Sequence, residues 1–146
     1  MSIVFFILRL ALAVLFIFSG TEKIISPYQN FLYVIQGYEI LKTPLDQWAA
    51  LLFPWLELFV GVFLLLGLWL KTALRGACLL FLSFITVVAQ ALIRNLPLKE
   101  CGCFGELISF PLPVILTMDS LMLILTIWLL IRIEKTSFLS LDRYFK

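Results

Sequence analysis

The stretch that decides the fold is residues 47–70, QWAALLFPWLELFVGVFLLLGLWL, in which Glu57 is the one charged residue. About 20 consecutive apolar residues cross the hydrocarbon core of a bilayer as a helix, and a tryptophan near each end of the stretch suits the two membrane–water interfaces. Gly61 and Gly67 would permit close approach of a neighbouring helix. The stretch therefore predicts a transmembrane helix.

Three further apolar runs share these properties, and together they indicate one membrane domain over residues 1–146. The chain is 63% hydrophobic and 14% charged, with a mean hydropathy of +1.11, whereas soluble domains have roughly 45–50% apolar and about 25% charged residues. We therefore predict an all-α integral membrane protein, a bundle of four transmembrane helices. The predicted spans are residues 3–19, 47–70, 72–93 and 114–131, and residues 132–146 form a terminal tail.

The loop of residues 21–46 is too polar to cross a membrane but carries apolar residues at helical spacing. Phe31, Ile35, Tyr38 and Leu41 recur three or four positions apart, as on one face of an α-helix. We predict an amphipathic helix that lies on the membrane surface between the first two spans. The alternative is a connecting loop with a few apolar anchors.

The distribution of basic residues predicts the orientation of the chain. With four spans, both termini and the turn between the second and third spans share one side, and the loops 21–46 and 94–113 lie on the other. The basic residues of the two sides are Lys71, Arg75, Arg132, Lys135, Arg143 and Lys146 against Lys23, Lys42, Arg94 and Lys99. Because basic residues are enriched in cytoplasmic segments, the excess predicts cytoplasmic termini and outer loops.

The second outer loop contains the pentapeptide Cys101-Gly102-Cys103-Phe104-Gly105, which brings two of the three cysteines together. A disulfide across a single residue closes a small, strained ring, and strained exposed disulfides tend to be oxidising and labile. Gly102 removes the Cβ that would obstruct closure. The pair suits thiol–disulfide exchange outside the cytoplasm, the alternative being unreactive or separately bridged cysteines. Cys78, in the third span, is interpreted as a small packing residue.

Charged residues inside the predicted spans are functional candidates, because each costs roughly 2.5–3.5 kcal/mol on insertion scales. Arg9 lies about 16 Å from the outer end of the first span, and Glu57 lies about 15 Å from the outer end of the second. Their matching depths predict an ion pair. In the alternative, Arg9 extends to the headgroups and Glu57 is protonated.

Further polar residues gather near the outer ends of the spans. Lys23 follows the first span, Arg94 closes the third, and Asp119 lies about two turns into the fourth. Either basic residue would favour the thiolate form of a nearby cysteine, and Asp119 or Glu57 would move protons when a dithiol is oxidised. For each residue alone, an anchoring role at the interface is the alternative.

The motifs resemble those of DoxX-like membrane proteins and, among them, the MauE (methylamine utilisation) branch. Cys101–Gly105 resembles the CGCFG signature of that branch, and Asp119 falls where the branch often has an acidic or amide residue at the start of its last helix. The positions that resemble the first two helices of the family are Phe18, Ser19, Gly20, Lys23, Pro27, Pro54, Glu57, Gly61 and Gly67.

The resemblance implies a four-helix bundle in the bacterial plasma membrane and a role in disulfide formation or maturation of exported proteins, with a thioredoxin-like partner. Other DoxX relatives are associated with electron transfer from sulfur compounds to quinone, so quinone is a candidate cofactor. Quinone-linked disulfide generators commonly carry two cysteine pairs. The single outer pair of this chain favours a relay through a thiol partner.

We therefore expect Cys101 and Cys103 to cycle between dithiol and disulfide at the outer face. The protein would be a thiol–disulfide oxidoreductase or an accessory to one, and it would act alone or in a homo- or hetero-oligomer. The net charge of +2 does not indicate nucleic acid, and the absence of histidine excludes imidazole metal sites and Ser-His-Asp catalysis. Two alternatives remain, a Cu(I)-type soft-metal binding or transport protein and a structural subunit of a membrane complex.

Overall fold

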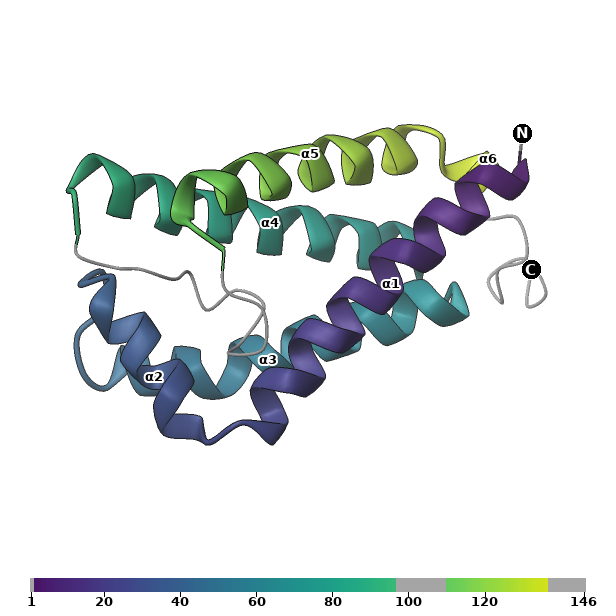
Figure 1. Ribbon diagram of the computed structural model, residues 1–146. Helices are drawn as coiled ribbons and strands as arrows, with labels where there is room; N and C mark the ends of the chain where they lie inside the picture. Colours follow the sequence, from purple (N-terminus) through teal and green to yellow (C-terminus); the bar gives the residue numbers. More distant parts are fainter. Residues whose placement is uncertain (1, 97–109, 137–146) are drawn as a thin grey trace.

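The computed structural model describes residues 2–96 and 110–136, which form helices joined by short connections (Figure 1). Four helices are long and apolar enough to cross a membrane, and no strand occurs in the described part of the chain. The predicted all-α, four-span fold is thereby confirmed. The helices are α1 (Ser2–Ile25), α2 (Tyr28–Gly37), α3 (Leu45–Leu66), α4 (Leu70–Ile93), α5 (Leu112–Ile131) and α6 (Ile133–Thr136).

The C-terminal ends of two helices differ from the predicted span limits by more than two residues, each for a local reason. The first span was expected to end before Gly20, but α1 continues to Ile25 because its polar last turns find partners inside the bundle. The second was expected to reach Leu70, but α3 ends at Leu66 because Gly67 adopts a left-handed conformation, with φ of 68°. Glycine enters this conformation without steric cost, so Gly67 ends the helix.

A close helix contact joins α1 and α3 and depends on two glycines. A Cβ on Gly20 would lie 2.8 Å from the backbone nitrogen of Leu58, and a Cβ on Gly61 would lie 2.9 Å from that of Ile17. Backbones approach this closely only where the side chain is a hydrogen atom. The predicted packing role is confirmed for Gly61, and Gly20 provides the matching contact surface on α1.

Two apolar clusters fill the bundle at different depths. The larger one joins α1, α3, α4 and α5, and in it the rings of Phe16 and Phe81 have their centroids 5.0 Å apart. The smaller one lies where α4 ends and α5 begins, and its buried members are Tyr38, Val88, Ala91, Leu112 and Ile115. Tyr38 therefore anchors the end of α2 to the last two spans.

Helix α2 confirms the short helix predicted between the first two spans, although it ends before Leu41. Pro27 precedes it, and none of its own residues is buried. Its attachment to α3 is polar, because the Gln36 amide donates to a carboxylate oxygen of Asp46 at 2.8 Å and the Tyr28 hydroxyl donates to the Gln47 carbonyl at 3.2 Å.

We expect Gln36→Ala to loosen α2 without unfolding the bundle. The variant removes one hydrogen bond to a buried carboxylate, a contribution of about 1 kcal/mol, and amide hydrogen exchange across residues 28–37 should accelerate roughly fivefold. Gln29→Ala, at a second exposed glutamine of the same helix, is the control and should exchange as the parent does. Equal exchange in both variants would contradict the role of the Gln36–Asp46 contact.

The start of α1 and the short helix α6 lie together at one end of the bundle, opposite α2 (Figure 1). They are joined by Arg9, whose Nη1 donates to the backbone carbonyl of Thr136 at 3.0 Å. The first residues of the predicted tail thus form a helical turn against α1. The assignment of this end to the cytoplasm stays a prediction.

Candidate functional site

A buried polar cluster of Ser19, Lys23 and Glu57 lies between α1 and α3. The Lys23 ammonium donates to both Glu57 carboxylate oxygens, at 2.8 and 2.9 Å, and to the Ser19 hydroxyl at 3.0 Å. Ser19 in turn donates to Glu57 at 3.1 Å. The three residues are 1–4% exposed, and their mutual hydrogen bonds satisfy the ammonium donors and balance its charge.

The local sequence explains how the three side chains meet. Ser19 and Lys23 are four residues apart, so both lie on one face of α1. Gly20, between them, brings the backbone of α1 against that of α3 next to Glu57. Because a charge inside a low-dielectric bundle is stable only when it is paired and hydrogen-bonded, this arrangement accounts for a glutamate in the apolar middle of α3.

The predicted Arg9–Glu57 ion pair is wrong. Glu57 pairs with Lys23, and Arg9 donates to Thr136 at the opposite end of α1. The depth estimate failed because it aligned the predicted ends of two helices that are in fact staggered. Gly20 contacts Leu58, so Arg9, eleven residues before Gly20, lies level with the far end of α3.

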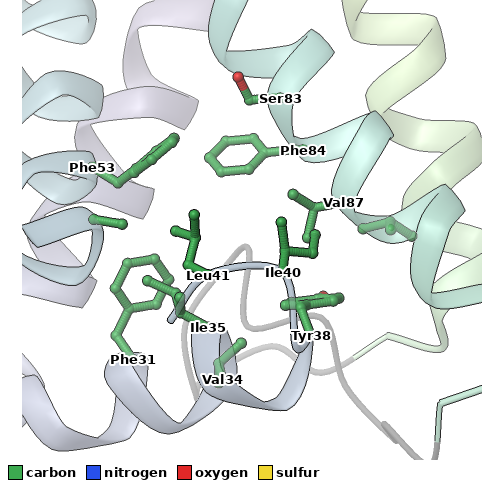
Figure 2. A pocket seen from close by; sticks show the side chains of 12 residues that line it. Phe31, Val34, Ile35, Tyr38, Ile40, Leu41, Phe53, Ser83, Phe84 and Val87 are labelled. Carbon is green, nitrogen blue, oxygen red and sulfur yellow. The ribbon is translucent and has the colours of Figure 1, made fainter. Parts of the chain in front are cut away.

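Two aromatic rings cover the ammonium group of the cluster. The Lys23 nitrogen lies 5.3 Å from the ring centroids of both Phe31, on α2, and Phe84, on α4. A cation over an aromatic face is stabilised by the ring quadrupole, more so when water is excluded. The same two rings form part of the wall of an apolar cavity of about 300 Å³ (Figure 2).

Asp119 is a further buried carboxyl group at this end of the bundle. It is 3% exposed, and its Oδ2 has no hydrogen-bond partner within residues 2–96 and 110–136. Burial raises the pKa of the Tyr38 hydroxyl to about 12, and the negative charge of Asp119 contributes to the increase. Tyr38 is thus a neutral phenol at physiological pH, in the electrostatic range of Asp119.

The remaining predicted site residues lie apart from the cluster or outside the described residues. Arg94 is exposed and pairs with Glu39 at 3.0 Å, so its charge is balanced at the surface. Cys78 is a free, half-buried thiol on α4. Cys101 and Cys103 fall within residues 97–109, outside the described part of the chain, which contains no group of three potential metal ligands.

The sequence did not single out Ser19 or Tyr38 as site residues. For Ser19 a signal existed, since its four-residue spacing from Lys23 places both on one helix face. For Tyr38 none existed, because it reaches the second apolar cluster from the connection after α2. Its contact with residues of α4 and α5 is a product of the tertiary fold.

Comparison with known proteins gives a consistent family assignment. The profile described as methylamine utilisation protein MauE matches residues 1–132. The methylamine utilization protein MauE of Paracoccus denitrificans is 28% identical over 116 residues, which cover 80% of this chain and 62% of that relative. No solved structure matches the chain. Because the profile match extends over almost the whole chain, including all four spans, this multi-pass membrane protein belongs to the MauE family.

Proposed function

We propose that this protein carries out thiol–disulfide exchange for exported proteins at the outer face of the bacterial plasma membrane, with Cys101 and Cys103 as the reacting pair. The partner is a thioredoxin-like or other exported thiol protein. Since the Paracoccus relative is named for methylamine utilisation, an exported protein of that process is the first candidate. In this orientation both termini face the cytoplasm.

The observation that supports this proposal is the attachment of the cysteine-bearing segment to the bundle. Leu96, which precedes residues 97–109 in the sequence, and Leu112, which begins α5 after them, both pack in the apolar cluster that contains Tyr38. Both flanks of the segment therefore lie at the end of the bundle where the charge of Asp119 acts on the Tyr38 hydroxyl. This shared location of the two flanks and of Asp119 supports Asp119 as a proton-transfer partner of the Cys101–Cys103 pair.

The exchange balances in two steps. In the first, a partner dithiol gives two electrons and two protons to the Cys101–Cys103 disulfide through a mixed disulfide, which leaves a disulfide in the partner and a dithiol here. In the second, the Cys101–Cys103 dithiol returns to the disulfide and gives up two electrons and two protons, which a membrane acceptor would take, with quinone as the candidate. Asp119 and Glu57 are the proposed residues for proton transfer in the second step.

The proposal predicts that Cys101→Ser and Cys103→Ser each abolish partner oxidation, whereas Cys78→Ser leaves it unchanged. Intact cells would be treated with a membrane-impermeant alkylating reagent before and after mild reduction, and the labelled cysteines identified by mass spectrometry. We expect label at Cys101 and Cys103 only after reduction. The redox state of the exported partner would be measured in the same cells.

Two outcomes would contradict the proposal. Normal partner oxidation in the Cys101→Ser/Cys103→Ser double variant would exclude the pair as the reacting group. Label that reaches both cysteines only after the membrane is permeabilised would place them on the cytoplasmic side.

A further inference from the structure

An apolar cavity of about 300 Å³ lies between α2, α3 and α4, next to the buried Lys23–Glu57 pair. Figure 2 shows Phe31 and Ile35 of α2 below it, Phe53 of α3 on one side, and Phe84 and Val87 of α4 on the other. A volume of this size is at the lower limit of small-molecule binding sites. The cavity volume equals that of roughly ten water molecules, at about 30 Å³ each.

The wall of the cavity suits hydrocarbon and does not suit water. A water molecule in a cavity needs two to four polar partners, and the side chains that line this one are carbon apart from two hydroxyl groups, those of Tyr38 and Ser83. The Ser83 hydroxyl already donates to the Leu79 carbonyl of its own helix at 2.8 Å. A hydrocarbon chain needs no polar partner and gains dispersion contacts with the surrounding rings.

The surroundings of the cavity favour an occupant that comes from the bilayer. Helices α3 and α4 are two of the four candidate membrane spans, and α2 is an amphipathic helix with no buried residue of its own. Lys23, whose ammonium group lies against Phe31 and Phe84 of the wall, is paired with Glu57. The positive charge of Lys23 at the wall is therefore balanced by Glu57. It gives an anionic headgroup no net attraction.

We propose that this cavity is a binding site for the hydrocarbon chain of a membrane lipid, inserted beneath α2. The occupant fills the space between the wall rings and so keeps water from the Lys23–Glu57 pair behind Phe31 and Phe84. This site links lipid binding to the buried ion pair, and it stands independently of the redox function of the cysteines.

The test uses the full chain in phosphatidylcholine nanodiscs with a trace of photoreactive lipid. One arm carries the diazirine in the acyl chain of a phosphatidylglycerol, and the other carries it in the chain of an isoprenoid lipid. We expect label on peptides that contain residues 31–41 and 83–88, competed by the unlabelled lipid of the same arm. The arm that labels these peptides identifies the source of the chain.

Matched variants make the test specific. Ala49→Phe places a ring in the cavity from α3 and should lower cavity labelling about tenfold or more. Ala11→Phe adds the same ring to an exposed position on α1 and should leave the labelling unchanged. Ser83→Leu fills the cavity from α4, and it replaces Ala49→Phe if that variant does not fold.

Three results would overturn the proposal. The first is that the cavity peptides are labelled no more strongly than residues 7–18 on the exposed face of α1. The second is that both Ala49→Phe and Ser83→Leu leave the labelling of the cavity peptides intact. The third is that the cavity peptides are labelled only in the Phe104→Ala variant. The last result would assign the cavity to the chain's own residues 97–109. Because the readout is lipid labelling, a failed cysteine assay does not affect it.

Discussion

Replacement of Lys23 by methionine is expected to lower the free energy of unfolding by about 3–5 kcal/mol, the cost of leaving one member of a buried ion pair without its partner. Lys23 and Glu57 are each 1% exposed at their side chains, so the carboxylate cannot regain water when the ammonium is removed. The measurement is an SDS titration of the purified protein in mixed micelles, followed by loss of helical circular dichroism.

Two comparisons separate the charge effect from lost packing. Lys23→Met/Glu57→Gln removes both charges and should recover more than half of the loss, because no buried charge then lacks a partner. Arg94→Met removes one member of the exposed Arg94–Glu39 pair, whose side chains are 45% and 61% exposed, and should cost at most about 1 kcal/mol. A Lys23→Met cost as small as that of Arg94→Met would show that the buried pair does not stabilise the fold.

Gly20→Ala is expected to destabilise the protein by about 1–3 kcal/mol, although alanine is favoured over glycine within a helix by about 1 kcal/mol. The new Cβ would lie 2.8 Å from the backbone nitrogen of Leu58 and 2.9 Å from the carbonyl oxygen of Pro54. Backbone atoms cannot turn aside as a side chain does, so α1 and α3 must separate where Lys23 meets Glu57. Thermal unfolding in detergent micelles measures the effect.

The matched control for this prediction is Gly76→Ala in α4. Its Cβ would lie 3.2 Å from a methyl group of the Val60 side chain, which can move, so the helix-propensity gain should offset the contact. Gly20→Ala should also cost less in the Lys23→Met background, because both changes act on one contact between α1 and α3. Equal unfolding temperatures for Gly20→Ala and Gly76→Ala would contradict the close approach of the two backbones.

The four spans and the helix between the first two could be read from the sequence because they depend on local composition. A helix such as α3 satisfies its backbone hydrogen bonds within itself and leaves apolar side chains for lipid. The spacing of Phe31 and Ile35 likewise predicts one apolar face for α2. Whether a segment forms a helix, and whether that helix is long and apolar enough to cross a membrane, therefore depends on the segment itself. The structure confirms these predictions.

The pairing of the buried charges depended on the register of α1 against α3, which no single segment contains. The sequence marked Arg9 and Glu57 as costly inside a membrane and placed Lys23 just after the first span. The depth estimate joined Glu57 to Arg9 because it assumed that the outer ends of the first two spans are level. The backbone contact at Gly20 sets the stagger between them. That contact brings Lys23 to Glu57. The sequence by itself determined which charged groups needed partners, and only the tertiary packing of the helices decided which partners they have.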